Sequence, residues 1–253
     1  FPSCGCGVPL SSSLASGVSP RREAVWCGPN RARGSFAWKL SAAAASGDGR
    51  FVTGDTAGPL GESAGRHQSG DGWTVFGGLG ASGCGSSLSS AYDISSDGQR
   101  CVGLGWSGCS AGAFLWTPAG GMFALPQSGP FSSRADTISG DGSVIGGWDE
   151  ASNGGRRAAV WREAPKSGAW EEDLLLAGMA GNTVGYGEVN GSNGDGSILV
   201  GMADGASDAS SGPFVHRDSE PLQLLGYLPP IVTPYSGGAL DVSDDGRTVV
   251  GFQ

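Results

Sequence analysis

One short pattern recurs five times along the 253-residue chain. Each copy contains Asp-Gly, an apolar residue three positions after that Gly, and a second Gly five positions after it. Four copies carry Ser three positions before the first Gly, and the fifth carries Asn193. Several positions keep the same spacing in all five copies. The pattern therefore indicates a repeated structural unit, because a high glycine content alone would not produce this spacing. The copies occupy residues 46–54, 95–103, 139–147, 193–201 and 243–251.

Each copy predicts two strands joined by a tight turn. Asp-Gly favours such turns because Gly accepts a positive φ and Asp can bond to the turn backbone. Apolar residues precede the turn, as at Ile94 and Ile138, and follow it, as at Val200 and Val250. The pattern is therefore typical of a β-hairpin.

A second block follows each hairpin. It contains a run ending in Trp or His, a Gly-rich turn and another apolar run, as in residues 113–116, 158–161, 213–216 and 64–67. A unit of about 50 residues with four strands suits a β-propeller blade. In the first unit, residues 42–45 and 64–67 fit poorly, which puts its first and third strands in question. Residues 170–179 suit either one helical turn or a loop leading into a strand.

The two ends of the chain each supply half a unit. Residues 22–26 and 36–40 match the second block but follow no Asp-Gly hairpin, whereas the last hairpin, at residues 243–251, is followed by no second block before Gln253. We therefore expect an all-β fold, a five-bladed β-propeller closed by N- and C-terminal strands sharing one blade, with Val25 beside Val250. A six-bladed ring is the alternative. The propeller domain would span residues 21–253, after a Pro/Ser/Cys-rich tail at residues 1–20.

The blocks resemble the HAF-type extracellular repeats of bacterial secreted and autotransported proteins. Residues 91–103 and 239–251 carry the match, together with residues 113–116 and 224–229. The resemblance covers residues 21–253. It implies a secreted or cell-surface location, while the functions of the family are mostly unassigned.

Charge and hydropathy argue against two classes of partner. The net charge is −9, only two residues are Lys, and no basic stripe exists, so neither nucleic acid nor an anionic membrane surface is expected as a partner. No apolar run approaches the roughly 20 residues of a membrane-spanning helix.

The six cysteines suggest an oxidising compartment. The Cys4-Gly-Cys6 spacing does not suit zinc. We expect a bridge between Cys101 and Cys109 or between Cys84 and Cys109, and another joining Cys27 to Cys4 or Cys6. The alternative for Cys101 is a buried small hydrophobic residue. The disulfide candidates are Cys4, Cys6, Cys27, Cys84, Cys101 and Cys109.

Several residues could carry chemistry. The Asp-Gly aspartates are interpreted as turn residues, with calcium binding as an alternative centred on residues 190–195. Asp93, Glu188 and Asp241 align in one column of the first strand and could converge in the channel as glycosidase carboxylates, or instead bond to backbone groups. Trp106 and Trp148 are placed in loops, where they would stack on sugars or plug blade ends.

The Trp and His residues that end the second-block runs are expected to pack between blades. These are Trp26, His67, Trp116, Trp161 and His216. The sequence therefore predicts a secreted, non-enzymatic propeller that binds carbohydrate or another extracellular protein, or serves as a structural module. The alternatives are a five-bladed glycoside hydrolase and a subunit of a larger extracellular assembly. Apart from the calcium alternative, no cofactor is expected.

Overall fold

The computed structural model describes residues 41–58, 60–80, 83–152, 154–175, 187–204, 211–226 and 237–252. Every element in these ranges is a β-strand, which confirms the all-β prediction. None of the described residues forms a helix long and apolar enough to cross a membrane. Residues 22–26 and 36–40, predicted to complete the last blade, lie outside the described residues.

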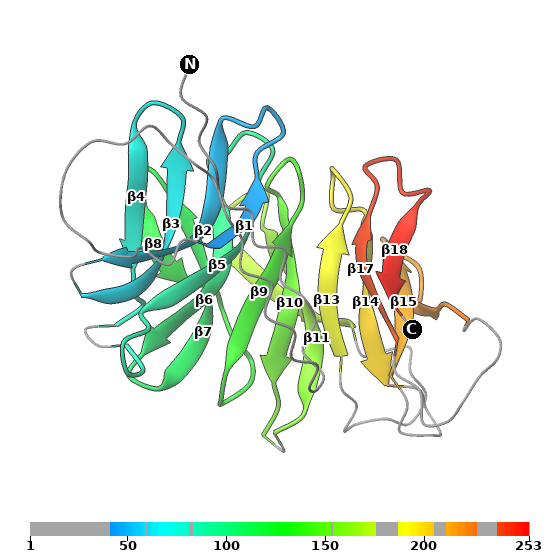
Figure 1. Cartoon of the computed structure of the whole chain (residues 1–253). Coiled ribbons are helices and arrows are strands. Elements are labelled where there is room, and N and C mark those ends of the chain that lie inside the picture. The colour runs from blue at the N-terminus through cyan, green and yellow to red at the C-terminus, as the bar shows by residue number, and fades with distance from the viewer. Residues whose placement is uncertain are drawn as a thin grey trace, which may run out of the picture.

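The strands form five antiparallel sheets (Figure 1). Sheet 1 contains β1 (Ser41–Ala45), β2 (Phe51–Gly58), β3 (Gly61–Gln68) and β4 (Gly72–Gly77). Sheet 2 contains β5 (Ser89–Ile94), β6 (Cys101–Ser107), β7 (Ser110–Thr117) and β8 (Gly121–Ala124). Sheet 3 contains β9 (Ser133–Ile138), β10 (Val144–Glu150), β11 (Arg156–Glu163) and β12 (Trp170–Leu174). Sheet 4 contains β13 (Gly187–Ser192), β14 (Ile198–Asp204), β15 (Ser211–Arg217) and β16 (Gln223–Leu224), and sheet 5 pairs β17 (Gly238–Val242) with β18 (Val249–Phe252).

Each sheet corresponds to one sequence unit. The Asp-Gly hairpin forms the first two strands, and in sheets 1 to 4 the second block forms the other two in chain order. The doubtful residues of the first unit do form strands, β1 and β3. Residues 170–174 form β12, so the helical alternative was wrong there. Partly buried and exposed residues alternate along β12, as in a strand with one exposed face.

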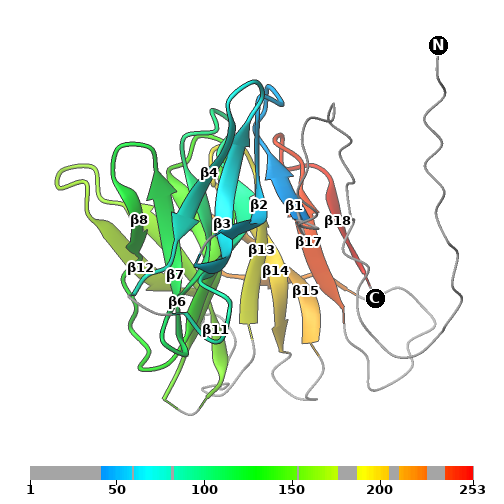
Figure 2. The same ribbon diagram turned by 60° about the vertical axis from the view of Figure 1, so that its left-hand side comes forward.

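The hydrophobic core lies between consecutive sheets, which follow one another in Figures 1 and 2. Phe51 and Ala64 of sheet 1 pack with Ile94 and Phe114 of sheet 2. The next two interfaces repeat this arrangement, from sheet 2 to sheet 3 and from sheet 3 to sheet 4. Val200 of sheet 4 belongs to a cluster with residues of sheet 5. Each sheet face therefore buries its apolar side chains against the next unit.

The second Gly of the repeat has a structural reason. The first strand of every sheet carries a bulge one residue before its last two residues, at Ala43, Tyr92, Asp136, Asn190 and Leu240. Opposite the bulge, a Cβ on the second Gly would lie closer than 3.0 Å to a carbonyl oxygen of the first strand. A side chain there would displace the ladder, so only Gly fits. The glycines concerned are Gly103, Gly147, Gly201 and Gly251.

Candidate functional site

The Asp-Gly aspartates build the turns, as predicted. Each accepts a hydrogen bond of 2.6–2.9 Å from the Ser or Asn two positions before it. Each also accepts one of 2.9–3.1 Å from the backbone N–H two positions after it. The Gly that follows has a φ between 68° and 78°. The Ser197 hydroxyl lowers the pKa of Asp195, and the Arg50 N–H lowers that of Asp48. The frame is therefore explained by turn chemistry.

The side chains of residues 190–195, considered above as a calcium site, already have hydrogen-bond partners within the protein. Asn193 donates to Asp195 at 2.9 Å, and the Ser197 hydroxyl donates to the same carboxylate at 2.6 Å. The Asn190 side chain donates to the Ala239 carbonyl at 2.9 Å. Across the described ranges, no three His, Cys, Asp or Glu residues gather closely enough to hold a metal ion. The geometry of residues 190–195 thus favours a structural turn.

Two of the three predicted channel acids share one position of the repeat. Asp93 and Asp241 each stand next to last in the first strand of their sheet, directly after the bulge. Thr137 and Ala44 occupy the same position in their own sheets. The strand register therefore confirms that Asp93 and Asp241 share one column.

Glu188 does not belong to this column, so the predicted alignment was wrong for this residue. Gly191 holds the corresponding position opposite Val200, whereas Glu188 lies opposite Met202 near the start of β13. The last position of the strand is apolar in the other units but is Ser192 here. The alignment took Val189 as the equivalent of Ile94, and so placed Glu188 in the column although the true position lies three residues later.

Asp93 joins the first strands of sheets 2 and 3. Its Oδ1 accepts the Ile94 N–H at 2.8 Å, and its Oδ2 accepts the Thr137 hydroxyl at 3.0 Å and the Ile138 N–H at 2.8 Å. Burial raises the pKa of Asp93 to about 6, and the negative charge of Asp241 adds to this effect against the three hydrogen bonds. Asp241 makes the equivalent bond to the N–H of the next residue. These contacts favour the interpretation that both acids bond to backbone groups.

Glu188 belongs to a separate charge cluster. Arg134 lies between two acids, with its Nη2 2.6 Å from Glu188 Oε1 and its Nε 2.5 Å from Asp136 Oδ1. Arg156 Nη1 lies 3.6 Å from Glu188 Oε2. Burial raises the pKa of Asp136 to about 8, although Arg134 opposes this shift. Arg134 thus bridges the Asp136 and Glu188 carboxyl groups, and Arg156 adds a second positive charge beside Glu188.

The two tryptophans predicted to lie in loops lie instead in strands. Trp106 belongs to β6 and Trp148 to β10, because both strands continue for several residues beyond the second Gly. Trp148 is only 4% exposed, and the Arg134 and Arg156 guanidinium carbons lie 5.4 and 4.2 Å from its ring centre. The Trp148 ring is therefore occupied by cation–π contacts and offers no face to a sugar. Trp106 is partly exposed.

The cysteine predictions are partly confirmed. Cys84 and Cys109 form a disulfide that joins the segment before β5 to the turn between β6 and β7. Cys101 is unpaired and fully buried, so its bridging alternative was wrong and the small-hydrophobic alternative is confirmed. Burial raises the pKa of the Cys101 thiol to about 12. Cys4, Cys6 and Cys27 lie outside the described residues.

The predicted column of aromatic residues packs between sheets. Trp161 is fully buried in the core between sheets 2 and 3, and Trp116 is 5% exposed between sheets 1 and 2. The Trp161 indole also donates to the Pro126 carbonyl at 2.7 Å. His67 and His216 occupy the same strand position, and Trp26 lies outside the described residues.

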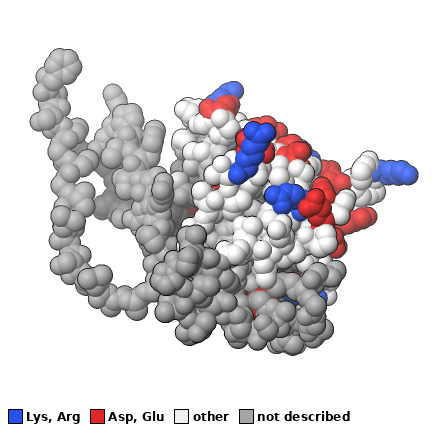
Figure 3. Space-filling view, turned by 90° about the vertical axis from the view of Figure 1, so that its right-hand side faces the viewer, with Lys and Arg blue, Asp and Glu red and all other residues white. Residues whose placement is uncertain are grey.

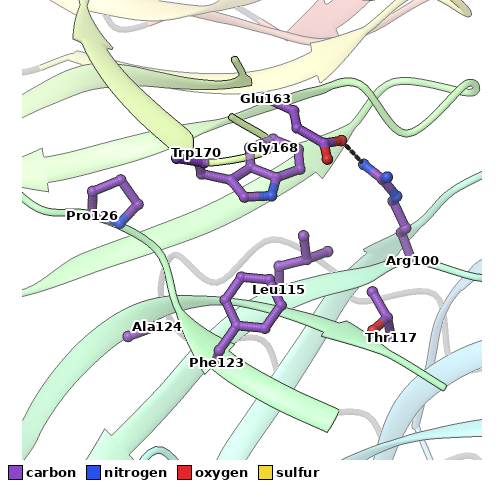
Figure 4. Close-up of a pocket in the computed structure, with 10 residues that line it drawn as sticks. Arg100, Leu115, Thr117, Phe123, Ala124, Pro126, Glu163, Gly168 and Trp170 are labelled. Carbon is purple, nitrogen blue, oxygen red and sulfur yellow. Dashed lines mark hydrogen bonds and ion pairs between the residues drawn. The ribbon is translucent and has the colours of Figure 1, made fainter. Parts of the chain in front are cut away.

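A cavity of about 390 Å³ opens between sheets 2 and 3 (Figure 4). One wall comes from β7 and β8, and the other from β11, β12 and the loop between them. Pro126 lies at one end and Arg100 at the other. The remaining lining residues are Leu115, Thr117, Phe123, Ala124, Glu163, Gly168, Ala169 and Trp170.

The cavity combines aromatic surface with an ion pair. Arg100 Nη1 lies 2.9 Å from Glu163 Oε2, and the Arg100 guanidinium carbon lies 5.7 Å from the centre of the Trp170 ring. Phe123 is 38% exposed, and Trp170 is partly buried. Aromatic faces beside a few polar groups suit a ligand that has both an apolar face and hydrogen-bonding groups.

Sequence reasoning identified none of the cavity residues as a site. The available signal was that Trp170 and Phe123 are aromatic residues outside the buried Trp/His column. They line one cavity because sheets 2 and 3, which belong to different repeats, pack against each other. An alignment compares equivalent positions of the repeats. It cannot reveal a site whose residues come from non-equivalent positions of two repeats.

The comparisons with known proteins concern the fold. No family model matches the chain, and no curated protein matches it in sequence. Among solved structures, TolB from Acinetobacter baumannii is 14% identical with a TM-score of 0.50, over 72% of this chain and 42% of that one. A TolB-type protein from Agrobacterium tumefaciens is also 14% identical, with a TM-score of 0.55, over 82% of this chain and 71% of that one. At this identity the likeness shows the fold alone, a TolB-like β-propeller.

Proposed function

We propose that this chain is a secreted, non-enzymatic β-propeller whose cavity between sheets 2 and 3 binds carbohydrate. The observation that carries the proposal is the cavity itself, where Trp170 and Phe123 lie beside the Arg100–Glu163 ion pair. Sugar rings have apolar C–H faces that stack on aromatic rings, and their hydroxyl groups bond to charged side chains.

Two observations support an extracellular location. Disulfides such as Cys84–Cys109 persist mainly in oxidising compartments. The HAF-type resemblance of the repeats implies the same location. Both fit a bacterial secreted or cell-surface protein.

The engagement of the predicted acids supports a non-enzymatic role. Glycoside hydrolysis generally requires two carboxyl groups flanking the scissile bond. Among the described residues that line the cavity, Glu163 is the single acid, and it is paired with Arg100. Asp93 and Glu188, proposed for the glycoside hydrolase alternative, are bonded to backbone groups and to arginines respectively.

We also propose that the propeller has five blades and closes when residues 22–26 add a third strand beside β18. Val250 is 55% exposed, although Val102 and Val200, at the same repeat position, are fully buried. Each of those two valines pairs with an apolar residue of a third strand. In the same register, Val25 would pair with Val250.

The surface around β18 agrees with such a partner. Phe252 and Leu240, also in sheet 5, are 48% and 49% exposed. Figure 3, which shows the molecule from this side, has an uncharged area next to the charged side chains. Unpaired, exposed apolar strand edges favour aggregation, and a closing strand would cover this one.

Truncation tests the closure. Removal of residues 1–20 should leave the melting temperature unchanged, because the closing strands are retained. Removal of residues 1–40 should lower it by more than about 5 °C. Equal melting temperatures for the two truncated chains would contradict the closure.

A glycan array tests the binding function. The wild-type chain should bind a defined set of glycans without cleaving them, and Trp170→Ala should lose that binding. Val75→Ala, which alters an exposed residue of sheet 1, is the matched control and should bind normally. Hydrolysis of a bound glycan would support the glycoside hydrolase alternative. Absence of any glycan binding would overturn the proposal and favour a protein partner or a larger assembly.

A further inference from the structure

Two acids of sheet 3 hold the loop of residues 125–132, which joins sheet 2 to sheet 3. Asp149 Oδ2 accepts the Ser128 hydroxyl at 2.9 Å and the Gly129 N–H at 2.7 Å. Glu172 Oε2 accepts the Ser128 N–H at 2.7 Å. Pro126, in the same loop, lines the cavity. The two carboxyl groups therefore help to set the position of one end of the cavity.

The same two carboxyl groups lie side by side at Ser128. Glu172 Oε2 accepts the Ser128 N–H, and Asp149 Oδ2 accepts the Ser128 hydroxyl. Asp149 is fully buried, and neither its Oδ1 nor Glu172 Oε1 has a hydrogen-bond partner among the described residues. Two ionised carboxylates cannot bond to each other, because neither carries a donor hydrogen. A proton or a cation between them would give both oxygens a partner.

Charge balance favours the proton. Arg157 Nη2 lies 2.9 Å from Asp149 Oδ2 and already neutralises one carboxylate. One shared proton makes the group of Asp149, Glu172 and Arg157 neutral, whereas a divalent cation would leave a buried net positive charge. Burial raises the pKa of Glu172 to about 7, and the negative charge of Asp149 adds to this shift.

We propose that Asp149 and Glu172 share one proton, and that its loss loosens residues 125–132 and the cavity end formed by Pro126. The proton-sharing pair stands on its own geometry, and only its consequence for a ligand rests on the proposed carbohydrate binding. The pair thus makes the cavity sensitive to pH.

The charged groups around the pair lie on the neighbouring strands. The loop of residues 125–132 has no ionisable side chain, and neither have β7 and β8. Glu171 and Asp173 of β12 are exposed, and the Glu150 carboxylate of β10 faces the Ser132 N–H. Glu172 bonds to the loop, and its pKa is raised to about 7. The other charged side chains of β9, β11 and the residue before β6 are Arg134, Asp136, Arg156, Arg157, Arg162, Glu163 and Arg100.

The direction of the pH effect follows from the raised pKa. The carboxyl pair binds the proton more tightly when residues 125–132 are docked on it than when they are released. In the released state the Glu172 pKa returns towards 4.5. Docking is therefore strongest in mild acid, weakens as the pH rises from about 4.5 to 7, and stays constant above that.

Hydrogen exchange of the full chain, measured by mass spectrometry between pH 5 and 8, tests the inference. After correction for intrinsic exchange rates, protection of residues 126–132 should fall at least about tenfold in the wild-type chain. Protection of residues 51–58, in β2, should stay constant. A wild-type loop whose protection follows that of β2 at every pH would overturn the proposal.

Two matched variants test whether Glu172 itself carries the pH effect. Glu172→Gln keeps an acceptor for Ser128 and adds a donor for Asp149, so protection should become independent of pH. Glu171→Gln, in the exposed neighbouring residue, should keep the wild-type profile. If 5 mM calcium, about a thousandfold over the protein, restored protection at pH 8, a cation would replace the proton and the proposal would fail. Failure of the glycan array would refute the binding function but leave this exchange profile unchanged.

Discussion

The substitution Gly201→Ala gives a sharp test of the structural reason for the repeat frame. A Cβ at residue 201 would lie closer than 3.0 Å to the Glu188 carbonyl oxygen, and 2.8 Å from Cε1 of the Phe214 ring. The carbonyl belongs to the β13–β14 ladder, and Phe214 is fully buried, so neither group can move aside freely. Overpacking of this kind costs about 3 kcal/mol of unfolding free energy.

Thermal unfolding followed by circular dichroism measures this cost. For a chain of this size, about 3 kcal/mol corresponds to a decrease in melting temperature of roughly 6–12 °C. Gly226→Ala is the matched control, because a Cβ there meets no atom within 4 Å, and it should leave the melting temperature unchanged. If Gly201→Ala melted together with that control, the close approach opposite the bulge could not explain the second Gly.

Two further predictions concern the disulfide and the buried acid of the first strand. Replacing Cys84 and Cys109 together by Ser opens a loop with a sequence separation of 25 residues, and should lower the free energy of unfolding in urea by about 3 kcal/mol; an unchanged midpoint would contradict the stabilising role. Because the folded pKa of Asp93 is about 6 instead of 3.8, its contribution to stability is largest in acid and decreases as the pH rises from about 4 to 6. Asp93→Asn should flatten this part of the stability profile by about 3 kcal/mol, and a variant profile as steep as that of the wild type would refute the reasoning.

The fold was predictable because its determinants are local and repeated. Asp141 and Gly142 fix a turn through contacts within five residues, and the same residues recur in every unit. The strands of the first unit were harder to recognise, since Ala45 and Arg66 stand where most other units have larger apolar residues. Their pairing is imposed by the neighbouring strands, which a local pattern does not contain.

The candidate site was largely unpredictable for a related reason. Trp170 and Phe123 line one cavity because two sheets pack together, and no spacing in the sequence encodes that arrangement. The error at Glu188 arose where Ser192 breaks the apolar pattern. The pairing of Asp149 with Glu172 likewise depends on a loop contact through Ser128.

Closure of the ring is tested most directly by cysteine crosslinking. In a chain carrying Val25→Cys and Val250→Cys, oxidation followed by peptide mass spectrometry should detect a disulfide between these positions, because paired strand residues lie within bonding range. A control chain with Val18→Cys and Val250→Cys should not form that bond. Absence of the Val25→Cys crosslink, or equal crosslinking in both chains, would contradict a propeller closed by its two ends.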